Sequence, residues 1–496
     1  MVHFKMHKKI INIKFEINFF DKLKKHLLQD EREQIAYLFC YNSVSEKENT
    51  FLPHKLIIFE PNHIDRSTGH VILPKIFAHE LYCQFIESDY TGLINCHSHP
   101  FEDSQVSFSE IDDKSDKHES KFIFEEIPHQ LERHLQKKQI FIASIVFGQK
   151  TICARSFDIK TNKFEHISKV IVLNDLIQYF NFSTTKESLR SDYKNISNRQ
   201  ILAFGEQGQK VLSQLKVSVL GIGGVGSIIA EGLCRLGIRY LQIVDNDIIE
   251  ITNLNRWQGA YSEDIGKFKV DVCSRNLKKY FQDIHITTFK ESLFNKNVVD
   301  SIKNSDCVIG CLDNEESRYF LNRLSMQYLI PYIDGGVAII TEGKSISNID
   351  INVSLVIPGR TRCLNCSSIK HFNKNQIHQF FLDKTTRNAL EKEGYIQSSE
   401  HIIDPAVYPL NMNLSSFMLF EFLNLFTGFK EPFWHIYMNH TLLNKQKSQH
   451  FLGTYNQYER NDELCLNCND YKGKGDSESL SYYYDSNKYI NILGEL

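Results

Sequence analysis

The sequence shows no excess of one charge and no long apolar run. Its 57 Lys and Arg stand against 60 Asp and Glu, a net charge of −3, which argues against nucleic acid as a main partner. Runs of about 18 uninterrupted apolar residues are absent, so no membrane-spanning helix is expected. Residues 1–25 mix apolar with charged side chains, unlike a signal peptide. We therefore expect a cytoplasmic protein that binds neither nucleic acid nor membranes.

Internal repeats are also absent, so the length is the first guide to the number of domains. A chain of 496 residues exceeds what one hydrophobic core usually covers, which favours two or three domains. The polar stretch 183–188 lies between two apolar-rich blocks and is typical of a linker. We predict a first domain at 1–165, a linker at 166–188, a second domain at 189–475 and a polar tail at 476–496.

The 12 cysteines do not indicate a disulfide framework, because eight of them are scattered in apolar or strand-like runs typical of reduced core residues. The other four form two Cys-x-x-Cys pairs, Cys363 with Cys366 and Cys465 with Cys468. This spacing lets two thiolates bind one tetrahedral zinc, although surface thiols or redox pairs are the alternative. Four thiolates leave no open position, so we predict a structural zinc site.

A glycine-rich turn in the second domain predicts a nucleotide site. Residues 217–220 read as a buried strand that runs straight into the turn, and an apolar helical pattern follows. Backbone N–H groups at such a turn are free to meet phosphate, and the helix dipole adds to the attraction. Asp245 follows the second strand, where a carboxylate can accept hydrogen bonds from ribose hydroxyls. The glycines of the turn are Gly221, Gly223, Gly224 and Gly226.

A glycine turn alone does not separate ATP from NAD or FAD, so the polar residues downstream decide. Two cations and two amides suit a triphosphate that must lose pyrophosphate, whereas a dinucleotide needs no such cationic clamp. ATP is therefore the favoured ligand. The downstream candidates are Asp247, Asn253, Asn255, Arg256, Lys269, Asp313 and Asn314, with Arg318 and Asn322 close behind.

The same domain alternates expected strands with helical patterns, which predicts a mostly parallel sheet covered by helices, with ligands at the carboxyl ends of its strands. The expected strands are 217–220, 241–244, 284–289, 307–311 and 332–335. An apolar run at 414–426 is interpreted as core or dimer interface.

With Arg199-Gln200-Ile201, Gly205 and Gln209 ahead of the first strand, these motifs resemble the ubiquitin-activating-type adenylyltransferases of the ThiF/MoeB/HesA kind over roughly residues 190–470. The resemblance implies a Rossmann-like domain that uses ATP and Mg²⁺ to adenylate a ubiquitin-like protein ending in glycine. It implies that Asp245 holds the ribose, that Gly224 and its neighbours approach the phosphates, and that Asp313 organises magnesium. Asn253, Arg256 and Lys269 would stabilise the phosphates, and Arg199 would reach the ATP of the partner subunit in a homodimer.

The first domain contains a candidate metal site. His97 and His99 stand at i and i+2 of an extended segment, so both imidazoles point to one side and can bind one metal ion. Asp112 is the candidate third ligand, and three protein ligands leave the fourth zinc position for water. The remainder of the charged run 112–117 is expected to be a solvated loop. The alternative is that both histidines are ordinary surface residues.

His97-Ser-His-Pro100 and Ser109-x-x-Asp112 resemble the JAB/JAMM (MPN-type) metallo-isopeptidases, an α/β fold. The resemblance implies that His97, His99 and Asp112 bind zinc, Glu33 is the general base and Ser109 stabilises the tetrahedral intermediate. The spacing between His99 and Ser109 is longer than usual in the family. Ser107 would restore it but would make Glu110 the third ligand, and we prefer Asp112. Glu31 is an alternative to Glu33.

Together the two resemblances predict zinc-dependent trimming or deconjugation of a ubiquitin-like protein and ATP-dependent activation of the same protein. Two alternatives stay open: adenylation of a peptide or small acid in natural-product synthesis, and an inactive scaffold that binds a ubiquitin-like protein. Residues 367–409 contain no cysteine, where related enzymes carry a thioester nucleophile. We therefore expect the adenylate to be passed to a separate conjugating enzyme or sulfur donor, or directly to an amine.

Overall fold

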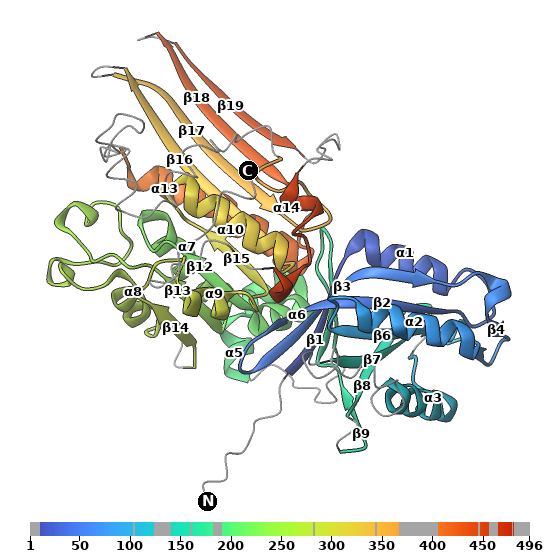
Figure 1. The fold of residues 1–496 in the computed structure, drawn as a ribbon. Coiled ribbons are helices and arrows are strands. Elements are labelled where there is room, and N and C mark those ends of the chain that lie inside the picture. The colour runs from blue at the N-terminus through green and yellow to red at the C-terminus, as the bar shows by residue number, and fades with distance from the viewer. Residues whose placement is uncertain are drawn as a thin grey trace, which may run out of the picture. The chain divides into compact units, whose positions relative to one another are not determined.

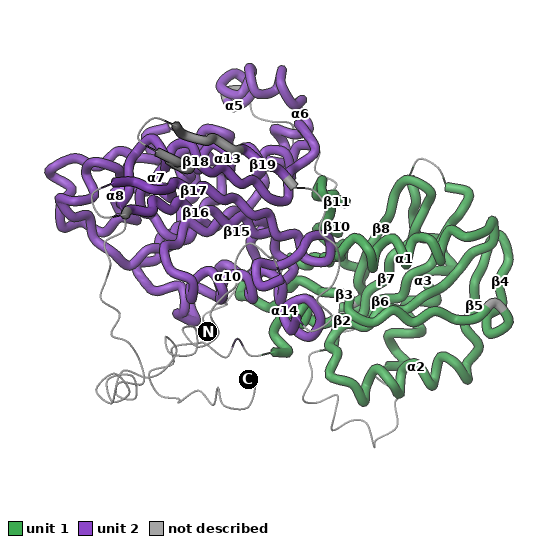
Figure 2. Tube along the Cα trace, turned by 90° about the horizontal axis from the view of Figure 1, so that it is seen from above, with its two compact units in different colours: residues 1–187, 472–479 green, residues 188–471, 480–496 purple. Residues whose placement is uncertain are grey.

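The computed structural model describes residues 10–102, 105–123, 140–158, 161–181, 191–280, 283–342, 345–366, 405–444, 447–455, 465–478 and 480. The chain divides into two compact units, drawn in green and purple in Figure 2. The first unit is residues 1–187 with 472–479, and the second is residues 188–471 with 480–496.

The first unit is built on one nine-stranded sheet with the order β11-β10-β1-β3-β2-β6-β7-β8-β9. Its strands are β1 (Ile10–Glu16), β2 (Ile35–Val44), β3 (Glu48–Ile58), β6 (Gly92–Ser98), β7 (Phe141–Phe147), β8 (Ile152–Asp158), β9 (Lys163–His166), β10 (Lys169–Leu173) and β11 (Gln178–Asn181). Its helices are α1 (Ile17–Leu27), α2 (Lys75–Glu87) and α3 (Glu110–Lys121), and η1 (Pro61–His63), β4 (Asp65–Arg66), β5 (Val71–Ile72) and η5 (Gly475–Ser477) are short.

Strand alternation explains why this sheet is covered on both faces. Along β2, Ala36, Leu38 and Cys40 pack with the apolar side of α1, which carries Phe20 and Leu23. The intervening residues Ile35, Tyr37 and Phe39 pack with Leu81, Tyr82, Phe85 and Ile86 of α2. The sheet is therefore buried between α1 on one side and α2 on the other, as Figure 1 also shows.

The predicted linker at 166–188 is wrong for the part that the structure describes. Strand β10 pairs in parallel with β1, and β11 pairs with β10, so both are strands of the main sheet. Val170 and Val172 are fully buried in the α1 side of the core. Residues 182–190, which include the polar stretch, lie outside the described residues.

The predicted division at 475 is also wrong, because residues 472–479 belong to the first unit. The Val44 N–H donates to Asp476 Oδ2 at 2.7 Å, and Lys472 Nζ lies 2.6 Å from Glu16 Oε2. Gly475 has φ +53°, and a Cβ there would stand 2.3 Å from the Asn42 carbonyl oxygen. Only glycine permits this approach of the segment to β2. Most of the predicted polar tail, residues 481–496, lies outside the described residues.

The second unit contains an eight-stranded sheet with the order β14-β13-β12-β15-β16-β17-β18-β19. The first five strands in this order, from β14 through β13, β12 and β15 to β16, pair in parallel. They match the predicted Rossmann-like half of the sheet. They are β12 (Lys216–Leu220), β13 (Tyr240–Val244), β14 (His285–Phe289), β15 (Cys307–Gly310) and β16 (Tyr332–Glu342). The antiparallel strands β17 (Ser345–Val356), β18 (His435–Asn444) and β19 (Lys447–Tyr455) extend it beyond the prediction.

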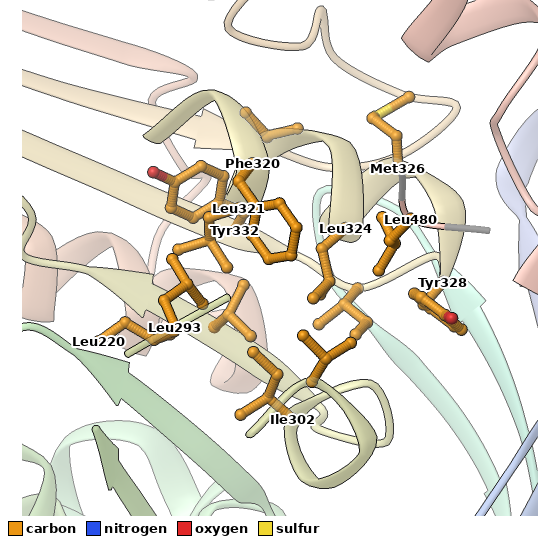
Figure 3. Packing of buried hydrophobic residues seen from close by; sticks show 14 of the residues in the cluster. Leu220, Leu293, Ile302, Phe320, Leu321, Leu324, Met326, Tyr328, Tyr332 and Leu480 are labelled. Atoms are coloured by element: carbon orange, nitrogen blue, oxygen red, sulfur yellow. The ribbon is translucent and has the colours of Figure 1, made fainter. Parts of the chain in front are cut away.

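Helices cover both faces of this parallel half. The α9–α10 side forms a core around Phe320, Leu324 and Tyr332 (Figure 3). Helix α13 packs on β16, where a Cβ at Gly335 would stand 2.3 Å from the Met418 sulfur. The helices are α5 (Ser191–Ile196), α6 (Asn198–Gln214), α7 (Gly224–Leu236), α8 (Lys269–Leu277), α9 (Lys296–Ile302), α10 (Glu315–Gln327), α13 (Tyr408–Thr427) and α14 (Leu466–Asn469), with η3 (Ile251–Asn253) and η4 (Ser262–Asp264).

The apolar run at 414–426 lies inside α13, and Leu414, Met418, Phe422 and Leu425 are fully buried in the unit. Within the described ranges, no helix has both the length and the apolar character needed to cross a membrane. The run is therefore part of the protein core.

Candidate functional sites

The first unit brings His97, His99 and Asp112 together. His97 is near the end of β6, His99 follows that strand, and Asp112 is in the first turn of α3. His97 Nε2 is 3.2 Å from Asp112 Oδ1, and His99 Nε2 is 3.5 Å from Asp112 Oδ2. Zinc bonds of about 2.0–2.1 Å in a tetrahedron give ligand separations of about 3.4 Å. The three side chains therefore fit a zinc ion.

A capping box at the start of α3 orients Asp112. Ser109 Oγ accepts from the Asp112 N–H at 3.2 Å and donates to Asp112 Oδ2 at 2.8 Å, while the Ser109 N–H donates to the same oxygen at 2.6 Å. These bonds give partners to backbone N–H groups at the start of the helix, and they hold the Asp112 carboxylate beside the histidines. Glu110, the third ligand under the alternative spacing, is exposed on α3 and has no place in the cluster.

The charged run 112–117 is part of α3, so the expectation of a solvated loop is wrong. Asp116 is buried, accepts from Ser144 Oγ at 2.7 Å and pairs with the Arg155 guanidinium at 2.6 Å. Arg155 also stacks on the ring of Phe108 at 3.8 Å, and that ring makes an edge contact with His97. This network fixes α3 against β7 and β8, and with it the position of Asp112.

Electrostatics in the site favour a charged carboxylate at Asp112. Burial alone would raise the pKa of Asp112, but hydrogen bonds from His97 and His99 outweigh it and hold the pKa well below the usual range. For His99, burial would lower the pKa, and the hydrogen bond to Asp112 and its charge raise it instead. A metal ion between these groups would compete with protons for the same side chains.

Glu33, not Glu31, faces this site. Glu33 is buried at the entrance of β2 and lines the same cavity as His97 and Asp112, whereas Glu31 is exposed. Burial raises the pKa of Glu33, and the two histidines oppose that shift. The raised pKa makes this carboxylate a stronger base than an exposed one.

The four cysteines of the two Cys-x-x-Cys pairs meet in the second unit. Cys363 Sγ is 3.7 Å from both Cys366 Sγ and Cys465 Sγ, and Cys366 Sγ is 3.6 Å from Cys468 Sγ. A tetrahedral zinc with bonds of about 2.3 Å separates its sulfur ligands by about 3.8 Å. The observed separations therefore fit a zinc ion, next to the core that contains Leu364.

We expect Cys465→Ser to lose one zinc equivalent and to lower the Tm by about 5–10 °C, because metal binding at a structural site contributes directly to folding. Metal analysis and thermal unfolding of the full chain measure both effects. Cys83→Ser, at a partly exposed cysteine of the first unit, is the control and should keep all its zinc. Unchanged zinc content in Cys465→Ser would contradict the assignment.

The glycine turn joins β12 to α7 as predicted. Gly221 has φ +85°, and a Cβ there would stand 2.5 Å from the Cys311 carbonyl oxygen. At Gly226 a Cβ would collide with the Gly221 carbonyl oxygen, so the helix can approach the strand only without a side chain. No described atom lies within 4 Å of the position of a Cβ on Gly223. The turn is thus tight on its protein side and open at Gly223, as a phosphate-binding loop requires.

Asp245 stands directly beyond the next strand, β13. Its Oδ2 accepts from the Ile222 N–H at 2.6 Å, and its Oδ1 accepts from the Asp247 N–H at 2.8 Å. Burial raises the pKa of Asp245, and the nearby Lys269 opposes the shift. The carboxylate therefore lies at the glycine turn, at the carboxyl edge of the sheet.

Lys269 begins α8 and reaches the same edge. Its Nζ lies 2.7 Å from Asp247 Oδ2, and its side chain is only 11% exposed, whereas that of Asp247 is 62% exposed. An anion with more charge than one exposed carboxylate can displace Asp247 and recruit this ammonium.

The other predicted nucleotide residues surround this edge without forming one cluster. Arg256 Nη1 donates to the Thr252 carbonyl at 2.5 Å and to Asn255 Oδ1 at 3.3 Å, and Asn253 Oδ1 accepts from the Glu250 N–H. Asp313 is exposed after β15, and its Oδ1 accepts from Asn314, which caps α10. Gly224 lies next to Arg256, whose carbonyl oxygen is 3.1 Å from the position of a Cβ.

Arg199 is exposed near the start of α6. Arg318, which the sequence also offered next to Asp313, holds the nucleotide edge by donating to the carbonyl oxygens of Leu312 at 2.7 Å and Gly335 at 3.0 Å. An arginine shortly after Asp313 in an amphipathic helix gave no signal that separated it from a phosphate ligand.

Comparison with known proteins identifies the second unit. The model of the ThiF family matches residues 197–465, more than half of the chain. The chain belongs to the ThiF family. The glycine turn, Asp245, Lys269 and Asp313 all lie inside the ThiF match, so the predicted family of adenylyltransferases is confirmed for this unit.

Among ThiF-family relatives, the sulfur carrier protein ThiS adenylyltransferase of Bacillus subtilis (strain 168) is 27% identical over 235 residues, 47% of this chain and 60% of the relative. The adenylyltransferase and sulfurtransferase MOCS3 of Caenorhabditis briggsae is 36% identical over 141 residues, 28% of this chain and 35% of the relative. The chain thus spans less than two thirds of the length of these curated relatives. The crystal structure of Escherichia coli MccB with MccA-N7isoASN has a TM-score of 0.43 at 18% identity, covering 56% of this chain and 77% of that one.

Proposed function

We propose that the second unit adenylates the C-terminal carboxylate of a ubiquitin-like protein ending in glycine. We further propose that the first unit is a JAB/JAMM-type zinc metallopeptidase that trims or releases the same protein. The observation that carries this proposal is the presence, in one chain, of a ThiF-family nucleotide edge and a compact His97, His99 and Asp112 cluster with Glu33 in its cavity.

In the adenylation step, a carboxylate oxygen attacks the α-phosphorus of ATP. The bond to the β-phosphate oxygen breaks and pyrophosphate leaves, so the protein mainly aligns groups and neutralises charge. Asp245 accepts hydrogen bonds from the ribose, and the N–H groups beyond Gly223 face the phosphates. Lys269 and Arg256 supply positive charge, Asn253 adds an amide, and Asp313 has the carboxylate that magnesium prefers.

In the peptidase step, His97, His99 and Asp112 would hold the zinc, which when bound would supply an acidic water and a Lewis acid. Glu33 accepts a proton from the attacking water and returns it to the leaving amine. Ser109 fixes Asp112 through the capping box, and its exposed hydroxyl lies beside the ligand set.

ATP–pyrophosphate exchange tests the adenylation and separates its alternatives. We expect exchange to depend on a ubiquitin-like protein ending in glycine and to vanish when the terminal glycine is deleted. Exchange with short peptides only would favour the peptide alternative. An absence of exchange with every carboxylate supplied would favour an inactive scaffold. We propose that Arg199 completes this reaction in a homodimer, so Arg199→Ala should lose exchange without losing the dimer.

We predict that the enzyme forms no thioester on a cysteine of its own. The segment 367–404, where the nucleophile of related enzymes is expected, lies outside the described residues but contains no cysteine. Elsewhere, burial raises the pKa of Cys273 to about 12 and that of Cys307 well above its usual range. Cys311 is partly exposed, yet burial still raises the pKa of its thiol.

A non-reducing gel of enzyme, magnesium-ATP and the ubiquitin-like protein tests this prediction. We expect no covalent band that reductant removes, because a thiol with a raised pKa is a poor nucleophile at neutral pH. A stoichiometric, reductant-sensitive band would overturn the prediction, and loss of that band in Cys311→Ser would locate the nucleophile.

A further inference from the structure

The cavity beside the metal cluster is larger than the reacting atoms of a peptide bond require. It has a volume of about 810 Å³ within the first unit, and α2, α3, β2 and β6 contribute to its walls. Apolar side chains such as Ile35 and Leu73 line it, together with two buried polar side chains that the peptidase chemistry does not use, Asn95 and Glu119.

These two residues share the faces that carry the metal ligands. Asn95 stands two residues before His97 on β6, so both point to one side of the strand, about 7 Å apart along it. Glu119 stands seven residues after Asp112 on α3, so both lie on one helix face, about 10 Å apart. Because an extended peptide advances about 3.4 Å per residue, the pair lies two to three residues from the metal ligands.

Both residues line the cavity, and both side chains carry hydrogen-bond acceptors. Glu119 is 7% exposed; its Oε1 accepts from the Tyr82 hydroxyl at 2.8 Å and its Oε2 accepts from Asn95 Nδ2 at 3.3 Å. Asn95 is 6% exposed, and its Oδ1 finds no donor among the described residues. Tyr37 also hydrogen-bonds to Glu119, which leaves about one lone-pair site of the carboxylate unused. That site and the unpartnered amide oxygen of Asn95 together favour a ligand with several N–H donors.

The charge of this end of the cavity also favours a cation. Burial raises the pKa of Glu119 to about 7, and the nearby Asp116 adds to the shift. A cationic ligand would favour the ionised carboxylate. The lysines that line the cavity, Lys75 and Lys114, are exposed to solvent, so water screens their repulsion of such a ligand.

We propose that Glu119 and Asn95 form a specificity pocket for a basic side chain, Lys or Arg, that lies within about three residues of the scissile bond of the substrate. The pocket rests on the proposed peptidase function of the same unit. The ammonium or guanidinium donates to Glu119 and to Asn95 Oδ1, while its aliphatic stem lies along Ile35 and Leu73.

Cleavage of internally quenched peptides by the zinc-loaded full chain tests the pocket. The peptides place Lys, Met or Glu at each of the positions nearest the bond, in an otherwise constant sequence. At one position we expect kcat/KM to be at least about 10-fold higher for Lys than for Met, the scale of a hydrogen bond to a charged group. Glu119→Gln should reduce that ratio to below about 3, and Glu110→Gln, on the exposed side of the same helix, should leave it unchanged.

A wild-type enzyme that cleaves these peptides without a basic preference, or that prefers Glu, would overturn the pocket and leave the peptidase intact. A wild-type enzyme that cleaves none of them would overturn the peptidase, and binding then decides the pocket. Calorimetry of Nα-acetyl-lysine N-methylamide with the full-length His97→Ala chain should show binding that weakens about 10-fold when Glu119→Gln is added. No binding to His97→Ala, or equal binding to both proteins, would overturn the pocket.

Discussion

Replacing Lys269 with alanine is expected to reduce ATP–pyrophosphate exchange by about 100-fold or more, the scale of losing one preorganised charge donor in a transition state. Lys269 Nζ is largely shielded from solvent beside the glycine turn, and within the described part of the chain it forms its ion pair with the exposed carboxylate of Asp247. Its charge is therefore available to a triphosphate. The measurement is exchange at saturating ATP with the cognate acceptor.

Lys267 provides a matched control two residues away. Lys267 Nζ pairs with Asp264, but Arg275 also pairs with Asp264, so Lys267→Ala leaves that buried carboxylate neutralised. For Lys267→Ala we expect exchange within about 3-fold of wild type, because the Lys267 side chain is half exposed and its ion pair is with Asp264. Near wild-type exchange in a folded Lys269→Ala protein would remove the assignment.

Replacing His97 with alanine is expected to lower the zinc content from two equivalents to one and to abolish peptidase activity while leaving adenylation unchanged. Two remaining ligands cannot hold a catalytic zinc, whereas the four-cysteine site belongs to the other unit and keeps its metal. Loss of a residue that hydrogen-bonds to a metal ligand typically lowers metal affinity by about 10–100-fold. Loss of a ligand itself should lower it further. Metal analysis and cleavage of a ubiquitin-like precursor measure the two effects.

His79→Ala is the control for this prediction, because His79 lines the same cavity but is exposed on α2 and lies outside the ligand cluster. It should keep two zinc equivalents. Unchanged zinc in His97→Ala would show that His97 is no ligand, and a parallel loss of adenylation would show that the variant damages the whole chain.

Motifs whose parts are close in the sequence could be predicted well. The glycine turn of β12 and α7 is such a case, since strand, turn and helix follow one another directly in the chain and each has its own local signal. His97 and His99 are another, because alternation along a strand places both imidazoles on one side. Asp112 could be predicted because Ser109 marks the start of a helix a short way beyond the histidines, and Asp112 lies in the first turn of that helix.

Contacts between distant segments could not be predicted in the same way. Residues 169–173 are rich in β-branched side chains, which favours a strand locally, but nothing in them indicates that they pair beside β1, from the start of the chain. Residues 472–479 join the first unit through Asp476, Lys472 and the close approach of Gly475 to β2, without an apolar run that would mark them. Loop closure over such distances leaves no local signature.

Two local patterns mark elements that the sequence-based prediction missed. Residues 345–356 alternate polar and aliphatic side chains along most of their length, which is typical of the half-buried strand β17. In α3, the spacing of Asp112, Asp116 and Glu119 at intervals of four and three places all three on one helix face. That periodicity indicates that the charged run belongs to a helix, although it does not indicate that Arg155 neutralises Asp116.

The central claim is that one chain processes and then activates the same ubiquitin-like protein. The most direct measurement is ATP–pyrophosphate exchange with a precursor whose terminal glycine is followed by a short extension, compared with the mature protein. We predict that wild-type enzyme supports exchange with both after cleavage of the precursor, and that His97→Ala supports exchange with the mature protein only. Exchange by wild type with the mature protein but never with the precursor, which stays uncleaved, would contradict the claim.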